Sequence, residues 1–542
     1  MQGETGKSVS LWREPEVPAT APTWDMKADV CVIGAGITGI TCAYLLTRRG
    51  KKVVVLSEGA PGSGETSRTT AQLCTALDRR YYELETLHGV QGARLAAESH
   101  KQAIQCIEEI VAEEGIDCAF ERLDGFLVKD PADDLSILQR ELEAARRAGL
   151  SEVDWVFQAP LKGFAPGPAL RFPRQGQLDP MRYLQGLARC VLRRGGHIFR
   201  DAQVTKIAGG RSVRVETRDG RVVTAAAAIV AAHTPSNDWV VLHTKQSAYR
   251  SYVIGARVPS ATAPRALIWD TCRPYHYVRT AKESPASKTE ILLVGGEDHK
   301  TGQEDDSEER FAALESWARE RFPQILSVDY RWSGQILEPY DGVAFIGPNP
   351  LDAENVFVAT GYSGLGMTHA MIAGIVLNRL VDGGTHEWLK LYDPARKTLR
   401  AAGTFLRENA NMVAQYADWL TGGEVASTEE IAPGTGAIYR QGLRKAAVYR
   451  DSDGKIHACS AVCPHLGGIV AWNSAEKTWD CPCHGSRFDA FGRVLNGPAD
   501  RNLSPFQLNG RRKSPEAEAS VLSRSFPKRG ARTEREEEGT PP

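Results

Sequence analysis

Apolar runs near the start of the chain alternate with a helical pattern. Residues 29–33 and 52–56 are short, largely apolar runs of the kind that form buried parallel strands. Between them, residues 34–39 are rich in glycine, and residues 40–49 have a helical pattern that ends at Gly50. The order strand, glycine turn, helix and strand predicts a βαβ unit of the size that dinucleotide-binding folds use.

Farther along the chain the pattern changes. Helical spacing with many charge pairs four residues apart covers residues 91–114 and 135–148. Short strand-like runs then follow from 197 to 260 and from 265 to 346. We expect five segments: a lead-in over residues 1–27, an α/β domain over 28–385 with a β-rich insertion over about 236–335, a helical connector over 386–423, a small all-β domain over 424–510, and a disordered polar tail over 511–542.

Composition and charge limit the classes of function. The 542 residues are too many for one ordinary core, and contents of 42% hydrophobic and 25% charged residues are typical of soluble globular proteins. A net charge of −1 gives no reason to expect binding to nucleic acid or to an acidic membrane. The most apolar helical stretch, residues 370–381, is too short to cross a bilayer. The N-terminus has no apolar signal core, so we expect a cytoplasmic protein without a membrane span.

The first glycine turn has the features of a dinucleotide site. Gly34 permits the tight turn, Gly36 lets the backbone approach a pyrophosphate, and Gly39 allows the helix to pack closely on the strand. The phosphates would then lie at the positive N-terminus of the helix. Glu58 follows at about the 20-residue distance at which an acidic residue binds the ribose. A glycine turn without a ligand is the alternative, and the context of strand, helix and acid disfavours it.

Four of the eleven cysteines gather in one segment, as Cys459, Cys463, Cys481 and Cys483. Cys463 is followed two places later by His465, and Cys481 three places later by His484. Two thiolates and two imidazoles are the ligand set of a Rieske [2Fe–2S] cluster, in which two histidines replace two cysteines on one iron. A Cys₂His₂ zinc site is the alternative, although zinc fingers pair cysteine with cysteine and histidine with histidine rather than alternating them.

The flavin-binding part resembles the D-amino-acid-oxidase-like family of FAD-dependent oxidoreductases over about residues 28–385. The family's second signature is matched by residues 341–347 and 355–367. By this resemblance the cofactor is FAD, bound without a covalent link because residues 64–71 and 335–340 hold no His or Cys in the attaching position. The family's ribose-binding acid falls on Ser57, one place before Glu58. The resemblance implies FAD contacts from Ser57, Glu58, Arg68, Thr69, Val204, Gly361, Gly364, Gly366 and Met367.

Residues 438–498 resemble a Rieske domain, which implies Cys463, His465, Cys481 and His484 as the cluster ligands. Many Rieske domains carry one further cysteine in each ligand loop, and the two form a disulfide. Cys483 matches one of them, but Gly468 occupies the partner position. A flavin domain followed by a Rieske domain is itself a known bacterial family, and it implies a Rossmann-like α/β domain with a β-rich substrate insertion plus a small all-β domain.

The two cofactors indicate an oxidoreductase. We expect dehydrogenation of a C–H bond next to nitrogen or oxygen in a small-molecule substrate, with electrons relayed between FAD and the cluster and a one-electron carrier protein as partner. The reverse current, as in a reductase, and a non-catalytic redox sensor stay open. Candidate catalytic residues are Arg279, Tyr277 and His276. Further residues of the β-rich insertion that could face the substrate are Tyr252, Tyr275 and His299. Arg279 would clamp the carboxylate of an amino-acid-like substrate, or would be an ordinary structural arginine.

Two further enzyme classes are disfavoured. A Rieske oxygenase needs an iron site of two histidines and one carboxylate. Glu85 and His88 have suitable spacing, but the next histidine is His100. A reductase with two dinucleotide sites would need a second strand, glycine turn and helix, and the pattern contains one such unit.

Overall fold

The computed structural model describes residues 6–12, 17, 26–159, 167–235, 242–284, 287–350, 352 and 354–508. The tail predicted over 511–542 lies outside these residues, as does most of the predicted lead-in. None of the described helices is long and apolar enough to span a membrane.

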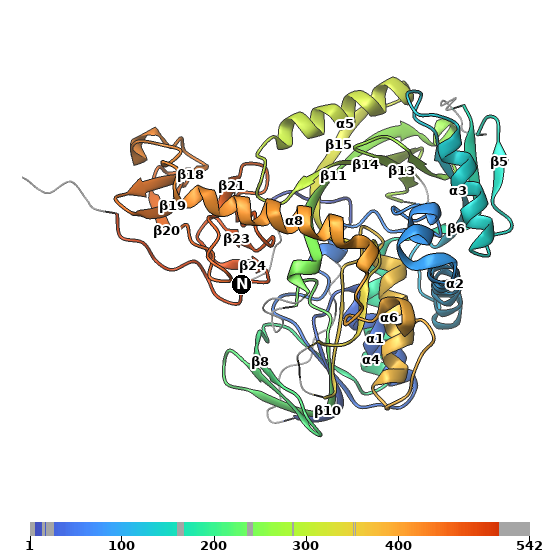
Figure 1. The fold of residues 1–542 in the computed structure, drawn as a ribbon, viewed down its shortest axis with the longest axis horizontal. Coiled ribbons are helices and arrows are strands. Elements are labelled where there is room, and N and C mark those ends of the chain that lie inside the picture. Colours follow the sequence, from blue (N-terminus) through green and yellow to red (C-terminus); the bar gives the residue numbers. More distant parts are fainter. Residues whose placement is uncertain are drawn as a thin grey trace, which may run out of the picture.

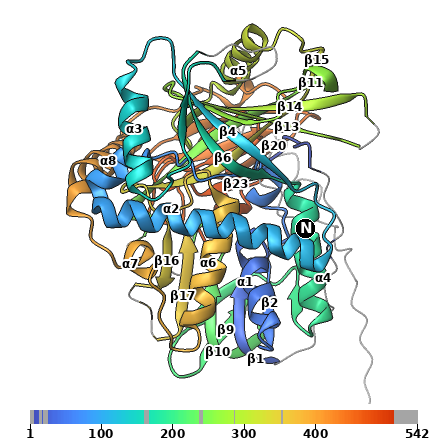
Figure 2. The ribbon, with the colours of Figure 1, turned by 90° about the vertical axis from the view of Figure 1, so that its right-hand side faces the viewer.

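A mostly parallel sheet forms the first layer. Its central strands are β1 (Met26–Ile33), β2 (Val53–Leu56), β7 (His197–Phe199), β10 (Val222–Val230), β16 (Phe345–Pro348) and β17 (Val356–Thr360). They lie in the order β16-β17-β10-β1-β2-β7, and the hairpin of β8 (Val204–Ala208) and β9 (Val213–Thr217) joins the sheet through antiparallel pairing of β9 with β10. Helices α1 (Ile37–Arg48), α4 (Pro180–Arg193) and α6 (Gly366–Leu380) pack together beside this sheet (Figures 1 and 2). The predicted βαβ unit is therefore present as β1, α1 and β2.

The second sheet is broader than the insertion predicted over 236–335. Its nine strands run in the order β15-β11-β14-β13-β12-β4-β6-β3, with β5 paired to β6. They are β3 (Gln72–Leu73), β4 (Glu121–Val128), β5 (Asp154–Val156), β6 (Ala169–Gln177), β11 (Gln246–Pro259), β12 (Leu267–Asp270), β13 (His276–Ala281), β14 (Thr289–Lys300) and β15 (Ser327–Pro339). Strands β3 to β6 lie upstream of the predicted insertion in the sequence. They join the sheet through the pairing of β4 with β12. Three strands are also long rather than short, with 14, 12 and 13 residues in β11, β14 and β15.

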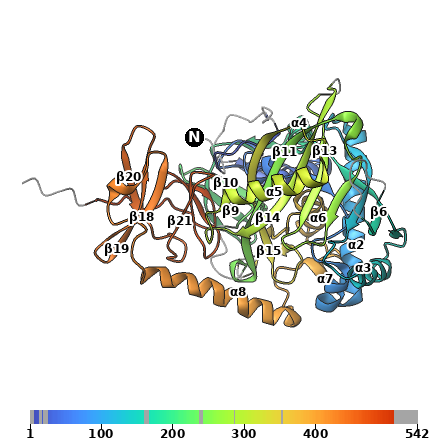
Figure 3. The same ribbon diagram turned by 90° about the horizontal axis from the view of Figure 1, so that it is seen from above.

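Helices cover the two sheets and connect the domains. They are α2 (Tyr81–Glu114), α3 (Ser136–Arg147), α5 (Ser307–Arg321), α7 (Leu389–Tyr392) and α8 (Ala402–Ala414), with 3₁₀ helices η1 (Glu65–Arg68), η2 (His243–Lys245), η3 (Ser260–Thr262), η4 (Leu399–Ala401), η5 (Gln415–Trp419) and η6 (Thr428–Glu430). Gly89 breaks α2 with a positive φ of 72°. Helix α8 runs from the flavin domain to the C-terminal domain (Figure 3).

The C-terminal domain is built from two small antiparallel sheets. One contains β18 (Thr435–Gln441), β19 (Arg444–Arg450) and β20 (Ile456–Ser460), and the other β21 (Ala471–Asn473), β22 (Thr478–Asp480), β23 (Arg487–Asp489) and β24 (Val494–Asn496). Ile438, Trp479 and Phe488 belong to its own buried core. The domain is therefore an all-β unit with a core separate from the cores of the flavin domain.

A buried ion cluster fastens this domain to the flavin domain. Glu476, between β21 and β22, accepts hydrogen bonds from Arg68 at 3.2 Å and from Arg250 at 3.1 Å. The hydroxyls of Ser8 and Ser333 donate to the same carboxylate at 2.6 and 2.5 Å. Arg250 has an exposed side-chain fraction of 0% and Glu476 of 1%. Burial favours the neutral acid, but Arg68, Arg250 and Arg487 outweigh it and lower the pKa of Glu476 to about 2.

We predict that Glu476→Gln lowers the thermal unfolding midpoint at pH 7 by an amount equivalent to roughly 3–5 kcal/mol, because it leaves two arginines buried without their carboxylate. Since the folded-state pKa of Glu476 lies below its usual value, the ion cluster contributes stability at neutral pH and loses it as the pH falls from about 4.5 toward 2. The difference between variant and wild type should therefore shrink in acid. Differential scanning calorimetry from neutral pH down to the acid limit of reversible unfolding measures it.

Glu320→Gln is the matched control, because Glu320 pairs with Arg321 at the surface with 76% of its side chain exposed. Its effect should stay below about 0.5 kcal/mol. Equal shifts in the two variants would contradict the assigned role of Glu476.

Candidate active site and cluster site

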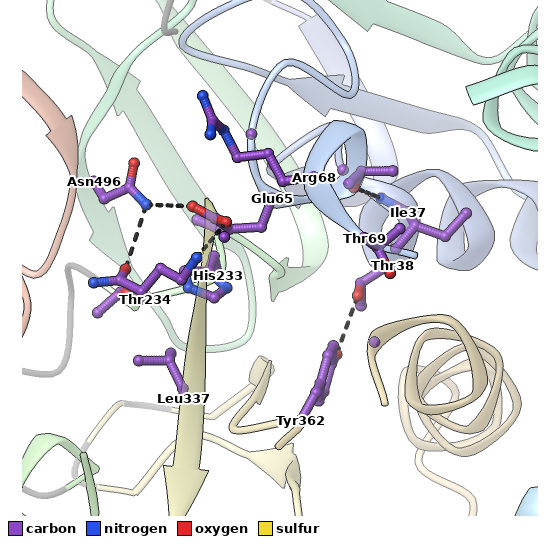
Figure 4. A pocket seen from close by; sticks show the side chains of 18 of the residues that line it. Ile37, Thr38, Glu65, Arg68, Thr69, His233, Thr234, Leu337, Tyr362 and Asn496 are labelled. Atoms are coloured by element: carbon purple, nitrogen blue, oxygen red, sulfur yellow. Dashed lines mark hydrogen bonds between the residues drawn. The ribbon is translucent and has the colours of Figure 1, made fainter. Parts of the chain in front are cut away.

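A cavity of about 380 Å³ opens where the carboxyl ends of the parallel strands meet the second sheet. Its walls come from the turns after β1, β2 and β10, from the 361–367 turn, from β11 and β15, and from residues 494–497 of the C-terminal domain. Figure 4 shows Glu65, Tyr362 and Asn496 around it, although they come from distant parts of the chain. Ligands of doubly wound sheets bind at this edge of the sheet.

The glycines of the first turn have the expected steric roles. Gly34 has a φ of +106°, and a Cβ there would lie 2.4 Å from the carbonyl oxygen of Ala231. A Cβ on Gly39 would lie 1.9 Å from the carbonyl oxygen of Gly34, so only glycine lets α1 pack against the turn. The N-terminus of α1 faces the cavity, and the Ile37 N–H donates to Thr66 Oγ1 at 3.0 Å. A pyrophosphate fits this helix end because its N–H groups and dipole favour an anion.

All but one of the predicted FAD-contacting residues line this single cavity: Gly34, Gly36, Ser57, Glu58, Arg68, Thr69, Val204, Gly361, Gly364, Gly366 and Met367. Gly39 lies behind the wall and acts through packing. Both Ser57 and Glu58 reach the cavity. The Arg68 guanidinium donates to Ser8, to the Ser333 carbonyl and to Glu476 rather than facing a phosphate.

Several cavity residues had no signal in the sequence. Glu65 accepts hydrogen bonds from the Gln335 N–H at 2.7 Å and from Asn496 Nδ2 at 2.9 Å. Thr38 Oγ1 donates to Tyr362 Oη at 3.2 Å, and this hydrogen bond joins the first glycine turn to the 361–367 turn (Figure 4). These contacts join segments hundreds of residues apart, so local spacing does not predict them.

The four predicted cluster ligands lie on two loops of matching geometry. The Gly467 N–H donates to the Cys463 carbonyl at 3.0 Å, and the Gly485 N–H donates to the Cys481 carbonyl at 3.0 Å. The Cys463 and Cys481 thiols are hydrogen-bonded neighbours. The His465 and His484 rings lie 5.0 Å apart at 86°. Each loop therefore presents one thiol and one imidazole toward a shared centre.

The donor set fits a metal cluster. Both ring nitrogens of His484 are buried without a hydrogen-bond partner. Burial, with a contribution from His465, lowers the pKa of His484 to about 4, so its ring is neutral at physiological pH. A neutral imidazole with a free lone pair is the form that binds a metal, and coordination would satisfy the orphaned nitrogen.

Gly468 and Cys483 lie next to each other in the structure, on the two ligand loops. A Cβ on Gly468 would lie 2.5 Å from Cys483 Sγ, so this glycine stands where a bridging cysteine would stand. All cysteines are free, and Cys459 Sγ lies near Gly492. The two ligand loops therefore lack the disulfide of many Rieske domains, as expected from Gly468 at the partner position.

The histidine side of the cluster site faces the flavin domain. Each of the two histidines is only 8% exposed. The His243 ring, in η2, lies 5.3 Å from the His465 ring and 6.3 Å from the His484 ring. Gln335 Nε2, from the cavity wall, donates to the Gly485 carbonyl at 2.8 Å. One side chain thus links the flavin cavity to the residue after a cluster ligand.

The structure removes Arg279 from the substrate site. Its guanidinium donates to the carbonyls of Thr70, Ala71 and Leu178 at 2.7, 3.0 and 3.0 Å. It also lies over the Trp12 ring at 5.5 Å, and it does not line the cavity. Arg279 is buried and joins separate backbone segments through these hydrogen bonds. Its side chain therefore does not form the expected carboxylate clamp.

The other substrate candidates divide into two groups. Tyr275 and Tyr277 line the cavity. His276 does not, because its Nδ1 pairs with Asp270 at 2.8 Å and its ring stacks on Trp317. Tyr252 and His299 bond to each other at 2.9 Å, also away from the cavity.

Other metal-binding combinations have competing partners. Glu85 pairs with Arg147 at 2.8 Å, and a ring nitrogen of His88 bonds the Asp341 carbonyl, so these two do not form an oxygenase iron site. Asp270, Cys272 and His276 come within 4.8 Å of one another. In that group Asp270 is already bonded to His276, and Cys272 is bonded to Asp130.

Comparison with known proteins identifies the family. A model of the FAD dependent oxidoreductase family, DAO, matches residues 29–380. The chain belongs to this family. A Rieske [2Fe-2S] domain model matches residues 422–507, so the protein is an oxidoreductase that carries FAD and a [2Fe–2S] cluster. The cofactors expected from the motifs are thereby confirmed.

Two relatives and one solved structure show how far the likeness extends. YhfW of Bacillus subtilis (strain 168), named for a Rieske 2Fe-2S centre, is 32% identical over 500 residues, or 91% of this chain and 96% of its own. The γ-glutamylputrescine oxidoreductase of Escherichia coli (strain K12) is 27% identical over 66% of this chain and 84% of its own. Glycine oxidase from Geobacillus kaustophilus has the same fold, with a TM-score of 0.58 and 19% identity over 69% of this chain and 99% of its own.

We predict that Gly468→Cys forms a disulfide with Cys483 under mild oxidation, because the new Cβ would lie close to Cys483 Sγ and Gly468 does not have a positive φ. Mass spectrometry of a peptide digest, with and without reduction, detects the crosslink. Gly468→Ser is the matched control with equal bulk and no thiol. If the introduced thiol and that of Cys483 both stay free in the oxidised variant, the loop geometry is contradicted.

Proposed function

We propose that this protein is a dehydrogenase that oxidises a C–H bond next to nitrogen in a small substrate and passes the electrons to its own Rieske cluster. The observation that carries the proposal is the burial of both cluster histidines against the flavin domain, where Gln335 connects the two sites. FAD supplies two-electron oxidation, and a [2Fe–2S] cluster carries single electrons.

The placement of the domains supports a relay within one chain. Gln335 donates to Gly485 and accepts from Asn496, both in the Rieske domain. Asn496 in turn donates to Glu65 of the cavity wall. Such bonded contacts hold the two cofactor sites at a fixed separation, so reduction of the cluster does not require a moving domain.

The relatives support nitrogen rather than oxygen beside the reacting carbon. The names of the E. coli relative and of the Geobacillus structure give γ-glutamylputrescine and glycine as the compounds acted on. In both molecules a nitrogen is bonded to an oxidisable carbon. A one-electron carrier protein would then accept electrons from the cluster.

We predict that an amine substrate added without oxygen bleaches the flavin first and reduces the cluster afterwards. In His484→Cys, an anionic thiolate replaces a neutral ligand and should lower the cluster potential. Flavin bleaching should keep its rate, while the one-electron equilibrium between flavin and cluster shifts about tenfold toward the flavin for each ~60 mV of lowered potential, so the cluster is reduced more slowly and less completely. Stopped-flow absorbance and electron paramagnetic resonance follow the two steps.

His457→Gln is the control, because His457 lies in the same domain but pairs with Asp451 away from the cluster loops. The proposed relay would be contradicted if His484→Cys lowers the cluster potential but the cluster is still reduced at the wild-type rate. A protein that no amine can bleach would favour the sensor, and reduction of the flavin by a reduced carrier would favour the reverse current.

A further inference from the structure

The cavity wall beside the 361–367 turn carries a negative charge. Asp78, Tyr275, Tyr277 and Trp269 line this part of the cavity. A Cβ on Gly364 would lie 3.2 Å from Asp78 Oδ2 and 4.0 Å from Tyr275 Oη, so Asp78 lies directly against this turn. Among the described residues that line the cavity there is no lysine, and the one arginine, Arg68, is bonded to Glu476.

The Asp78 carboxylate has no counter-ion of its own. It opens into the cavity, and none of the described residues makes a hydrogen bond or an ion pair with it. Arg80, the arginine whose charge lowers the pKa of Asp78, donates instead to the carbonyls of Leu77 and Asp270. The Asp78 side chain is exposed to the open cavity rather than packed inside the protein, so a ligand that enters the cavity can reach it. A ligand that displaces the water there would leave this carboxylate without a partner unless it supplies a positive charge.

Two more carboxyl groups stand behind Asp78. Asp298 lies beside the hydroxyls of Ser251 and Tyr275 without a hydrogen bond of good geometry, and both of its oxygens are buried. Glu338, on β15, repels both aspartates. A substrate carboxylate would add a further negative charge to this group, while an ammonium group would neutralise part of it.

The aromatic side chains point to the same ligand charge. The Tyr275 and Tyr277 rings lie 5.9 Å apart on the wall that Asp78 shares, and Trp269 lines the cavity with them. Aromatic faces attract cations, most strongly where water is excluded. This feature is independent of the carboxyl groups and agrees with them.

We infer that Asp78, backed by Asp298 and Glu338 and flanked by Tyr275 and Tyr277, binds the ammonium group of an amine substrate that has no carboxylate beside the reacting carbon. This inference rests on the proposed function and names its substrate class. Asp78 also accepts a proton from the bound ammonium. The nitrogen then has the free lone pair with which it can form a C=N bond as the neighbouring carbon loses a hydride, and that hydride would go to the oxidised FAD that this family binds.

Charge coupling gives the site a pH dependence. Burial, then repulsion from Glu338, raises the pKa of Asp78 to about 7 against the pull of Arg80. Burial likewise raises the pKa of Asp298 to about 7. The titratable and charged groups that face Asp78 are Glu338 on β15, Asp298 on β14, Tyr275 and Tyr277 at β13, Cys74 after β3, and Arg80 before α2. Affinity for a cation should rise with pH as these acids ionise.

The test compares two probes of matched shape: sarcosine, and N-methylisobutylamine, which has a branched alkyl group in place of the carboxylate. Both are added without oxygen to the full-length protein loaded with FAD and cluster. Binding is measured from the ligand-induced rise of the unfolding midpoint, and reaction from flavin bleaching. We expect the wild type to bind the amine in preference to sarcosine, with affinity increasing from about pH 6 to about pH 8.

In Asp78→Asn, the amine should bind at least about 30-fold more weakly at pH 8, the lower end of the cost of losing one partner of a buried charge pair. Its preference over sarcosine and the pH dependence should both decrease. Without ligand the variant should unfold at the same temperature as wild type or higher at pH 8, because a carboxyl with a raised pKa opposes folding once it ionises. Glu83→Gln, in the first turn of α2 and outside the cavity, is the matched control.

Preference of the wild type for sarcosine, failure of the amine to bind, or unchanged affinity in a folded Asp78→Asn would each overturn the inference. These outcomes are separate from failure of the proposed function. In that case the amine would bind and bleach the flavin, but the cluster would stay oxidised.

Discussion

The buried carboxylate of Glu476 fixes the geometry on which both cofactor sites depend. It lies in the Rieske domain and binds Arg68 next to the flavin cavity and Arg250 in the second sheet. One charge therefore joins the three structural units of the chain. Ion clusters this deep are stabilising only when every partner is in place, because each unpaired charge would carry its own desolvation cost. The arrangement specifies one docking of the domains rather than a range of them.

Strand β15 transmits that constraint to the chemistry. Ser333 bonds Glu476, Gln335 bonds the loop of a cluster ligand, and Glu338 belongs to the acidic group behind Asp78. Three residues within one six-residue stretch thus interact with the ion cluster, the iron–sulfur loop and the acidic group of the cavity wall. Since β15 is paired with β11 along its whole length, a displacement at one of these points would be felt at the other two.

The sequence predicts features that local spacing determines. Gly34–Gly39 and the cluster loops are short runs whose residue types and spacing identify both the turn and its ligand. The extent of the second sheet was missed because β4 pairs with β12, and no periodicity reports such a pairing. Arg279 shows the same limit, since only the fold reveals that Thr70, Ala71 and Leu178 occupy its guanidinium. Glu65, Gln335 and Asp78 gain their roles entirely from distant neighbours.

The contrast between Glu476 and Asp78 separates structural from functional charge in this protein. Glu476 is buried and held by two arginines and two hydroxyls, while Asp78 is exposed to the cavity and has no bonded partner among the described residues. The chain has nearly equal numbers of acidic and basic residues, so a scarcity of cations does not explain the difference. A fold that can neutralise one buried acid so completely, and leaves another facing an open cavity, has placed the second where a ligand must complete it.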